Sequence, residues 1–187
     1  MFTMDIPSFN RSPFGVRVPY TKPPKRKVFI SYHHKNDQGW YDSFSKYCSD
    51  TLDLFYDNSL ERKVDSDDSE YLNRKIREEY IFGTSVTIVL CGSETGKRRW
   101  VDWEIYATLF YRHGLIGIAL PTCSRSYDQK YIVPTRLHNN IESGYALWMT
   151  WTENVAILAK NIEEAVSRSS QTRLVRNSDP KMKRSYS

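Results

Sequence analysis

The sequence has no long apolar run and few cysteines, and both absences limit the classes of protein to which it can belong. In 187 residues no window approaches the roughly 18 consecutive apolar residues of a membrane-spanning helix. The N-terminal region carries prolines and charges without a continuous apolar segment, so we expect neither a secretory signal nor a membrane partner. Cys48, Cys91 and Cys123 are odd in number and far apart, which predicts reduced thiols in a cytoplasmic protein.

Several motifs of common enzyme classes are also missing. Neither GxGxxG nor GxxxxGK[ST] occurs, since the segment 92–97 (GSETGK) is too short for a Walker loop. Ser93 follows a glycine but lacks the GxSxG context of a nucleophile turn. His33 and His34 are adjacent without further ligands at metal-site spacing, so we expect loop histidines and no metal. The sequence therefore lacks motifs that kinases, ATPases and Rossmann dehydrogenases require, which argues against these classes.

The net charge of +5 is concentrated at the two ends of the chain. Residues 1–27 hold six Lys or Arg against one Asp, and residues 167–187 repeat that count, so the remainder is acidic. A nucleic-acid-binding fold usually carries its basic surface on the folded body, and we therefore do not expect nucleic acid as a partner. Binding through the tails is an alternative that steep salt dependence would reveal.

The region between the tails alternates strand-like runs with amphipathic segments, which is typical of βαβ units and a parallel sheet. The apolar runs predict five strands, at residues 28–32, 52–56, 85–91, 115–120 and 144–151. Helices are predicted around residues 40–47, 69–80, 100–113 and 153–166, with a polar loop at 33–37 and a charged loop at 61–68.

These elements predict a single α/β domain over residues 26–166 with a doubly wound sheet of about five parallel strands. Residues 1–25 are rich in proline and predict an extended N-terminal lead-in. Residues 167–187 are polar and basic and predict a flexible C-terminal tail. Ligands of doubly wound sheets bind beyond the carboxyl ends of the strands, so we expect the functional site at that edge.

Glu104 is the most conspicuous charged residue near that edge. On the helix that begins at Trp100, it shares one stripe with Trp100, Ala107 and Tyr111. A lone carboxylate in an aromatic and apolar stripe is unfavourable unless it is paired or used. The sequence leaves two interpretations open, a functional carboxylate or an ion pair with a nearby cation within residues 97–99.

Three segments together resemble the TIR-like domains of bacteria, in particular the TIR protein of the Thoeris antiphage system. They are residues 27–33 (KVFISYH), 86–95 (VTIVLCGSET) and 98–105 (RRWVDWEI). The resemblance extends over roughly residues 25–166, and the basic tails have no counterpart in it. It implies a flavodoxin-like fold and, as in the catalytic members of the family, cleavage of the nicotinamide–ribose bond of NAD. NAD would then be a substrate, and no cofactor is expected.

The resemblance also implies roles for individual residues. The family's catalytic glutamate falls on Glu104, and the end of the first strand falls on the nucleotide-binding side. Aromatic rings near that glutamate could stack on nicotinamide or adenine. The residues expected to bind substrate are Phe29, Ser31, Tyr32, His33, Asp57, Ser93, Trp100 and Trp103.

Two hypotheses of different classes follow from the resemblance. The first is an NAD-consuming enzyme that makes a cyclic ADP-ribose-type signal, which activates a partner effector protein; such enzymes often self-associate to complete the site. The second is a TIR-like module for protein–protein interaction without chemistry, because the fold by itself does not imply an activity. The acidic residue at position 104 in its Trp-rich context favours the enzyme.

Overall fold

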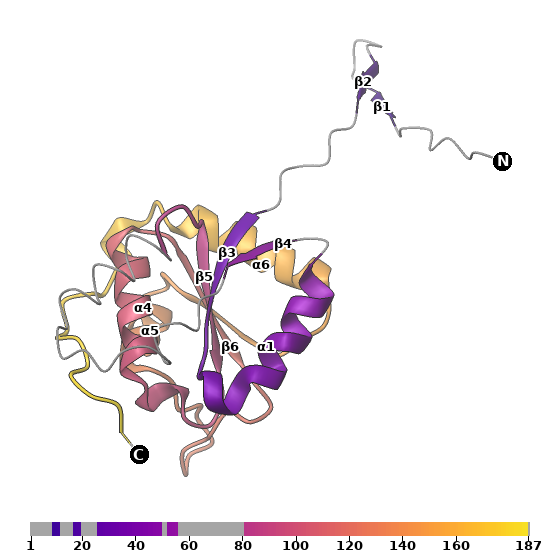
Figure 1. Ribbon diagram of the computed structural model, residues 1–187. Coiled ribbons are helices and arrows are strands. Elements are labelled where there is room, and N and C mark those ends of the chain that lie inside the picture. Colours follow the sequence, from indigo (N-terminus) through magenta and orange to yellow (C-terminus); the bar gives the residue numbers. More distant parts are fainter. Residues whose placement is uncertain (1–8, 12–16, 20–25, 50–51, 56–80, 187) are drawn as a thin grey trace.

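The structure is a computed structural model that describes residues 9–11, 17–19, 26–49, 52–55 and 81–186. Asp57, the charged loop predicted at 61–68 and the helix predicted at 69–80 lie outside the described residues. Within the proline-rich lead-in, two short strands, β1 (Phe9–Arg11) and β2 (Arg17–Pro19), pair antiparallel and form a sheet separate from the main one (Figure 1).

The main sheet has five strands, and all of their pairings are parallel. Its order is β4-β3-β5-β6-β7 (Figure 1). The strands are β3 (Arg26–Ser31), β4 (Leu52–Phe55), β5 (Val86–Cys91), β6 (Gly114–Ala119) and β7 (Leu147–Thr150). Each overlaps a predicted strand, and the predicted flavodoxin-like α/β fold with one domain is confirmed.

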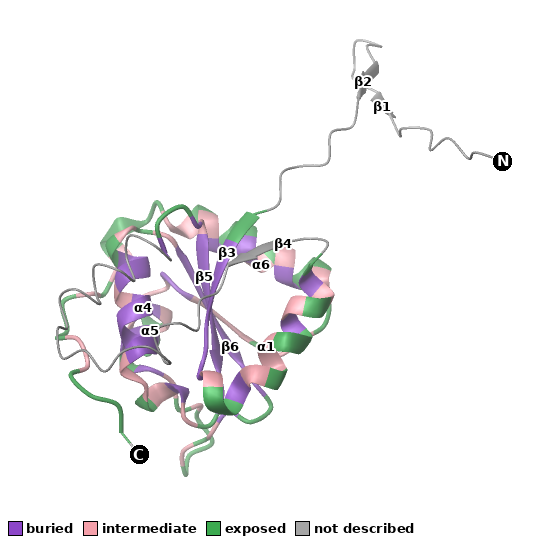
Figure 2. Ribbon diagram, in the orientation of Figure 1, coloured by how far each residue is buried: buried purple, intermediate pink, exposed green. Residues whose placement is uncertain are grey.

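Helices cover both faces of this sheet, and the strands between them are mostly buried (Figures 1 and 2). The side chains of β3 and β5 alternate between the two faces. One face packs against α1 (His34–Cys48) and α6 (Val155–Arg168) through residues such as Ile30, Ile88 and Leu158. The other packs against α4 (Arg99–Phe110) and α5 (Thr135–Glu142) through residues such as Val89 and Leu137. Burial of both faces explains why the central strands are continuous apolar runs in the sequence.

The starts of α6 and α1 compare differently with the sequence prediction. Asn154 caps α6, and its Oδ1 accepts hydrogen bonds from the backbone N–H groups of Ala156 (3.1 Å) and Ile157 (3.2 Å), as the predicted start near residues 153–154 required. The polar loop predicted at 33–37 is wrong, because α1 already begins at His34. The carbonyl of His33 accepts the N–H of Asp37 at 2.9 Å, which closes the first turn.

Helix α5 has no counterpart among the predicted helices. Its apolar stripe is short, since only Leu137 and Ile141 pack on the core, and its other buried side chains, Arg136 and Asn140, are polar. Arg136 is only 2% exposed and Asn140 is fully buried. The helix ends before Gly144, whose φ of +81° suits a glycine.

The segment that follows α6 differs from the flexible tail predicted for residues 167–187. Helix α6 continues to Arg168, and a short 3₁₀ helix, η3 (Thr172–Leu174), comes next. The chain then lies against α5 and α4, where Asn140 binds the backbone of Arg176 through both its amide nitrogen (2.8 Å) and its oxygen (2.9 Å). Backbone groups that bond to a buried side chain are ordered parts of the fold.

Two further features bear on the expectations from composition. Among the described residues no helix has both the length and the apolar character needed to cross a membrane. Cys48, Cys91 and Cys123 are free and buried. Burial raises the pKa of the Cys48 thiol to about 12 and that of Cys91 well above its ordinary value, so both remain protonated and unreactive at neutral pH.

Two glycines in different surroundings predict opposite effects of substitution by alanine. Gly114 lies where α6 packs closely on β6, and Gly39 lies in open space on α1. A Cβ at Gly114 would lie 2.8 Å from the carbonyl carbon and oxygen of Ala165, and neither backbone can move freely. We expect Gly114→Ala to lower the free energy of unfolding by roughly 1–3 kcal/mol. Gly39 lies within α1 and has nothing within 4 Å, so Gly39→Ala should raise it by about 0.5–1 kcal/mol. Urea denaturation of both variants measures the contrast, and equal effects would contradict it.

Candidate functional site

The candidate site lies where the order of the strands reverses relative to the chain. The strands on either side of β3 are β4 and β5, so the connections that leave β3 and β4 run in opposite directions along the sheet. Doubly wound sheets leave a crevice for ligands at the carboxyl ends of the strands at this switch point. Here β3 ends at Ser31, with His33 two residues further on, and the segment from Gly92 to Arg98 joins β5 to α4.

Alternation along β3 decides which predicted residues face α4. Phe29 belongs to the cluster of Trp100, Trp103 and Ala107, which are all on α4. Ser31 follows two positions later on the same face of the strand. Tyr32 belongs instead to the cluster on the α1 face, where its hydroxyl donates to Gln38 Oε1 at 2.8 Å. Phe29 and Ser31 are therefore on the side of Glu104, and Tyr32 is not.

Glu104 lies in the middle of α4 and is 9% exposed. Its backbone is fixed to the sheet, because its carbonyl accepts the hydroxyl of Thr108 at 2.8 Å. The Thr108 oxygen lies 2.6 Å from the hydroxyl of Thr87 on β5, and since Thr108 spends its single proton on Glu104, Thr87 is the donor. All three residues are buried, so this chain of hydrogen bonds sets the height of Glu104 relative to β5.

Two indole rings accompany Glu104 on α4. Trp100 and Trp103 are 9% and 3% exposed and meet edge to face, with ring centroids 5.3 Å apart. The Arg99 guanidinium lies 4.3 Å from the Trp100 ring centroid, and Trp103 Nε1 donates to the carbonyl of Met182 at 2.8 Å. Trp100 lies one turn before Glu104 on the same face of α4, and Trp103 directly precedes Glu104 in the sequence, so aromatic surface lies next to position 104.

The cations near Glu104 in the sequence bind other groups. Arg98 donates through Nη2 to Glu94 Oε2, and Lys97 Nζ lies 3.9 Å from Glu94 Oε1. Arg99 stacks on Trp100, as described above. Arg98 and Lys97 therefore form their ion pairs with Glu94, in the loop after β5, and not with Glu104 as one interpretation of the sequence proposed.

Three buried polar atoms at the switch point lack hydrogen-bond partners. They are Ser31 Oγ, His33 Nδ1 and Arg98 Nε, and no other described residue has such an atom. Burial lowers the pKa of His33, so the ring is neutral near pH 7 and its Nδ1, 4.0 Å from Glu94 Oε2, forms no salt bridge. Buried polar atoms without partners are unfavourable, and their clustering at one edge of the sheet indicates a place for a polar ligand.

Asp37 is a buried carboxyl group that sequence reasoning did not single out. It is 1% exposed, and Thr95 Oγ1 donates to its Oδ2 at 3.3 Å. A Cβ at Gly92 would lie 2.2 Å from Asp37 Oδ1, so only glycine lets the loop after β5 approach so closely. Burial raises the pKa of Asp37 to about 6, and the charge of Glu94 adds to this effect.

The remaining predicted residues are spread around the site. Ser93 is exposed in the loop after β5, and its carbonyl accepts the Ser124 hydroxyl at 3.2 Å. Asp57 lies outside the described residues. The structure thus brings Phe29, Trp100 and Trp103 into one cluster between β3 and α4, the helix that carries Glu104, while Ser31 and His33 lie at the end of β3.

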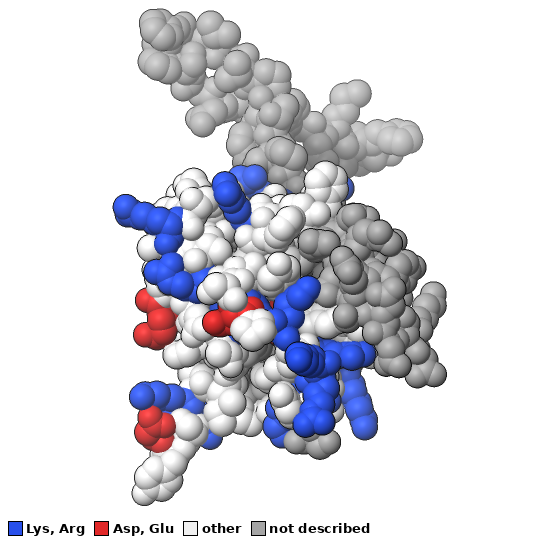
Figure 3. All heavy atoms as spheres, turned by 90° about the vertical axis from the view of Figure 1, so that its left-hand side faces the viewer, with Lys and Arg blue, Asp and Glu red and all other residues white. Residues whose placement is uncertain are grey.

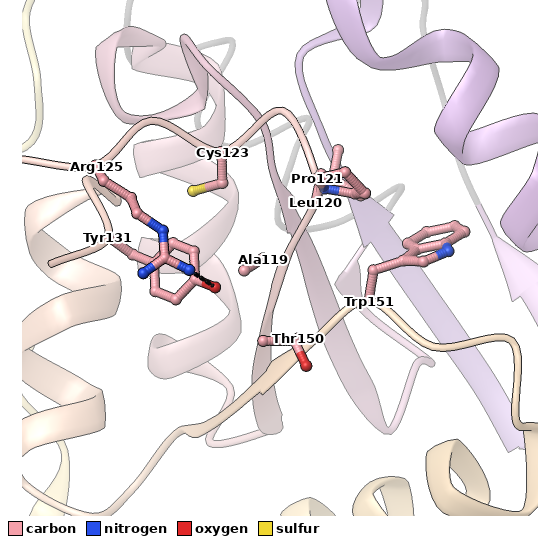
Figure 4. A pocket seen from close by; sticks show the side chains of 8 residues that line it. All are labelled: Ala119, Leu120, Pro121, Cys123, Arg125, Tyr131, Thr150 and Trp151. Carbon is pink, nitrogen blue, oxygen red and sulfur yellow. Dashed lines mark hydrogen bonds between the residues drawn. The ribbon is translucent and has the colours of Figure 1, made fainter. Parts of the chain in front are cut away.

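A pocket of about 240 Å³ opens at the carboxyl ends of β6 and β7 (Figure 4). Its walls are Arg125 and Tyr131 on one side and Trp151 on the other, with Ala119 between them. The Arg125 guanidinium lies 4.1 Å from the centroid of the Tyr131 ring, and its Nη2 donates to the Tyr131 hydroxyl at 2.6 Å. None of the predicted site residues lines this pocket.

Comparison with known families gives one match. The family model described as "Thoeris protein ThsB, TIR-like domain" matches residues 29–125, which is just over half of the chain. The matched range begins at Phe29 and includes all of the predicted site residues through Glu104. None of the curated proteins matches the chain.

Asp37 predicts an unusual dependence of stability on pH. Its pKa of about 6 in the fold exceeds the ordinary 3.8, so the folded state binds this proton more tightly. The free energy of unfolding should therefore fall as pH rises through the interval between these values, by roughly 2 kcal/mol from this group. Urea denaturation at pH 4.5 and pH 7 should show the fall in the native chain and a smaller one in Asp37→Asn. An identical pH slope in the two proteins would contradict the assignment.

Proposed function

Because the chain belongs to the Thoeris ThsB TIR-like family, we propose that it is an NAD-consuming enzyme of antiphage defence. It cleaves the nicotinamide–ribose bond of NAD⁺ and forms an ADP-ribose-type product of the cyclic class, which activates a partner effector protein. The observation that carries this proposal is the buried Glu104 on α4, the helix whose Trp100 and Trp103 pack with Phe29, near the end of β3, where Ser31 and His33 have buried polar atoms without partners.

The chemistry suits a site with one carboxylate. When the bond between ribose C1′ and the pyridinium nitrogen breaks, the electron pair goes to the nitrogen, and nicotinamide leaves as a neutral molecule. No general acid is needed for this departure. The ribose is left with oxocarbenium character, and a carboxylate held in apolar surroundings stabilises such a developing positive charge. Glu104 is the residue to which we assign this role.

The fate of the ribosyl cation depends on the nucleophile that reaches it. Capture by water gives ADP-ribose and a proton, whereas capture by a nitrogen or hydroxyl of the same molecule gives a cyclic product and a proton. Cyclisation needs water to be excluded and the internal nucleophile to be held near C1′. The rings of Trp100 and Phe29 supply apolar walls on the described side of the site.

The direct test of this proposal replaces the carboxylate and keeps its shape. Incubation of the purified chain with NAD⁺, followed by liquid chromatography and mass spectrometry, should show nicotinamide release by the native protein. Glu104→Gln should reduce release by roughly 10²–10³-fold, the usual effect of removing one electrostatic stabiliser. Glu142→Gln, which changes an exposed carboxylate on α5, serves as the matched control and should retain activity.

The product mass separates hydrolysis from cyclisation in the same experiment, because the cyclic product is lighter than ADP-ribose by one water. If the site is completed by self-association, release per protomer should rise with protein concentration. Equal release by the native chain and Glu104→Gln would remove Glu104 from the chemistry. No release at high concentration, or from phage-infected cells, would favour the non-catalytic interaction module.

Ser31 gives a second prediction, in which stability and activity change in opposite senses. Its Oγ is buried without a hydrogen-bond partner, so Ser31→Ala removes an unfavourable group and should leave the free energy of unfolding equal or higher. If the hydroxyl serves the substrate, KM for NAD⁺ should rise by about tenfold. Steady-state kinetics and urea denaturation measure both. An unchanged KM would show that the hydroxyl does not contact substrate.

A further inference from the structure

The helix that carries Glu104 is held on its outer side by the C-terminal strap, which we define as residues 176–186. The strap runs along α4 in the opposite direction to the helix. Near its beginning, Asn177 Nδ2 donates to the carbonyl of Tyr106 at 3.1 Å, and near its end the N–H of Tyr186 donates to the carbonyl of Lys97 at 3.0 Å. The strap therefore follows α4 from its C-terminal half to the turn before its first residue.

Arg136 of α5 anchors the strap beneath its first half. Its guanidinium binds Asp102 on α4 through Nε (2.9 Å) and Nη2 (3.4 Å). Its other acceptors belong to the strap, namely Asn177 Oδ1 (2.9 Å) and the carbonyls of Asp179 (3.1 Å) and Pro180 (3.2 Å). Because a buried guanidinium needs a partner for each donor, Arg136 requires the strap in this position.

The backbone of Met182 forms hydrogen bonds with two consecutive residues of α4. Its N–H donates to Asp102 Oδ2 at 2.8 Å, and its carbonyl accepts the Trp103 indole N–H at 2.8 Å. Asp102 and Trp103 are the two residues that immediately precede Glu104. Lys181 adds to these contacts, since its Nζ lies 5.6 Å from the centroid of the Trp103 ring.

The end of the strap completes the N-terminus of α4. Arg98 at the N-cap position makes no capping hydrogen bond with its side chain. The hydroxyl of Ser185 instead accepts the N–H of Arg99 at 3.1 Å, so a residue distant in sequence takes the part of the cap. The first turn of α4 is thus tied to the strap at both its backbone and its side chains.

Glu104 lies between these two sets of restraints. On the sheet side, Thr108 and Thr87 hold its carbonyl at a fixed height above β5. On the outer side, the strap holds Asp102 and Trp103, which fixes the rotation of the helix about its own axis. A rotation of α4 would move the Glu104 carboxylate relative to β3, where the substrate is expected to lie.

We propose that the C-terminal strap is a positioning element of the active site, and that it acts through Asp102 and Trp103 to hold Glu104 in its catalytic orientation. This inference rests on the proposed function. The hydrogen bonds of the strap given above go to α4, α5 and the backbone of Lys97, and not to the end of β3, where substrate is expected, so its loss should change the rate of the chemical step more than the affinity for NAD⁺. Small misplacements of a catalytic group reduce rates by large factors.

The test removes one hydrogen bond of the strap by changing one residue. Met182→Pro deletes the N–H that binds Asp102, whereas Met182→Ala keeps both backbone groups and controls for the side chain. We expect Met182→Pro to lower kcat by about tenfold or more with KM within about twofold, and Met182→Ala to behave like the native chain. Hydrogen exchange of the amides in Arg99–Trp103 should accelerate in Met182→Pro only.

A chain that ends at Pro180 gives a second variant. It retains the strap residues that Arg136 binds and loses Met182, Ser185 and Tyr186, so kcat should fall with little change in melting temperature. Unchanged kcat in both variants would overturn the inference, as would a fall that only follows the loss of folded protein by circular dichroism. Absence of nicotinamide release from the native chain is a different result, which overturns the proposed function and this inference with it.

Discussion

The buried ion pair between Asp102 and Arg136 is the interaction on which the arrangement of α4, α5 and the C-terminal strap depends. The Asp102 and Arg136 side chains are 10% and 1% exposed, and Nε and Oδ1 lie 2.9 Å apart. Removing one member of such a pair leaves an uncompensated charge in the interior, which commonly costs about 3–5 kcal/mol. Each element supplies one part of the network: α4 the carboxylate, α5 the guanidinium, and the strap the acceptors for the remaining donors. The Asp102–Arg136 ion pair, together with the acceptors that the strap supplies to Arg136, therefore fixes the position of α4, the helix that carries Glu104.

Hydrophobic patterning predicted the sheet well, because the strands are buried on both faces. The β5 run at Val86–Cys91 is fully buried and β-branched, and its strand was predicted within one residue. The same reasoning missed α5 and the strap, whose fixed positions come from polar groups. Arg136 and Asn140 are buried by pairing, and pairing leaves no periodic signal in a sequence. In the sequence, Pro134 before the helix and Gly144 after it were the available indications.

The candidate site was predictable to a similar degree. The structure has Trp100 and Glu104 on one helix, as the periodicity predicted, and residues four apart in a helix share a face. The alternation of β3 would also have separated Phe29 and Ser31 from Tyr32, had the strand been read with a period of two. Asp37 could not be found in this way, because Gly92, which approaches it closely, lies in the loop after β5, more than fifty residues later in the sequence. Long-range contact of this kind is a property of the fold.

Some basic side chains of the C-terminal region contact the rest of the chain, and others are exposed to solvent. The charge of Lys181 is used within the chain, since its Nζ lies 4.7 Å from the Tyr106 ring centroid and near that of Trp103. Lys183 and Arg184 are exposed. The side of the molecule along which the C-terminal segment runs shows more basic than acidic side chains (Figures 1 and 3). The strap lies on this basic face because hydrogen bonds with Asp102, Trp103 and Arg136 hold it there.

Most buried polar groups of this fold have hydrogen-bond partners, and the few that lack them differ from those that hold the structure together. Arg136 is among the most deeply buried charged side chains, and its donors have acceptors on three elements of the structure. Asn140 is likewise satisfied at both ends of its amide. Against that background, the unpartnered atoms of Ser31, His33 and Arg98 stand apart, and all three meet at the switch point of the sheet. A fold that satisfies a buried guanidinium so fully has no packing reason to leave three polar atoms unpaired at one edge. Under the function proposed above, the polar groups of the substrate would supply these missing partners.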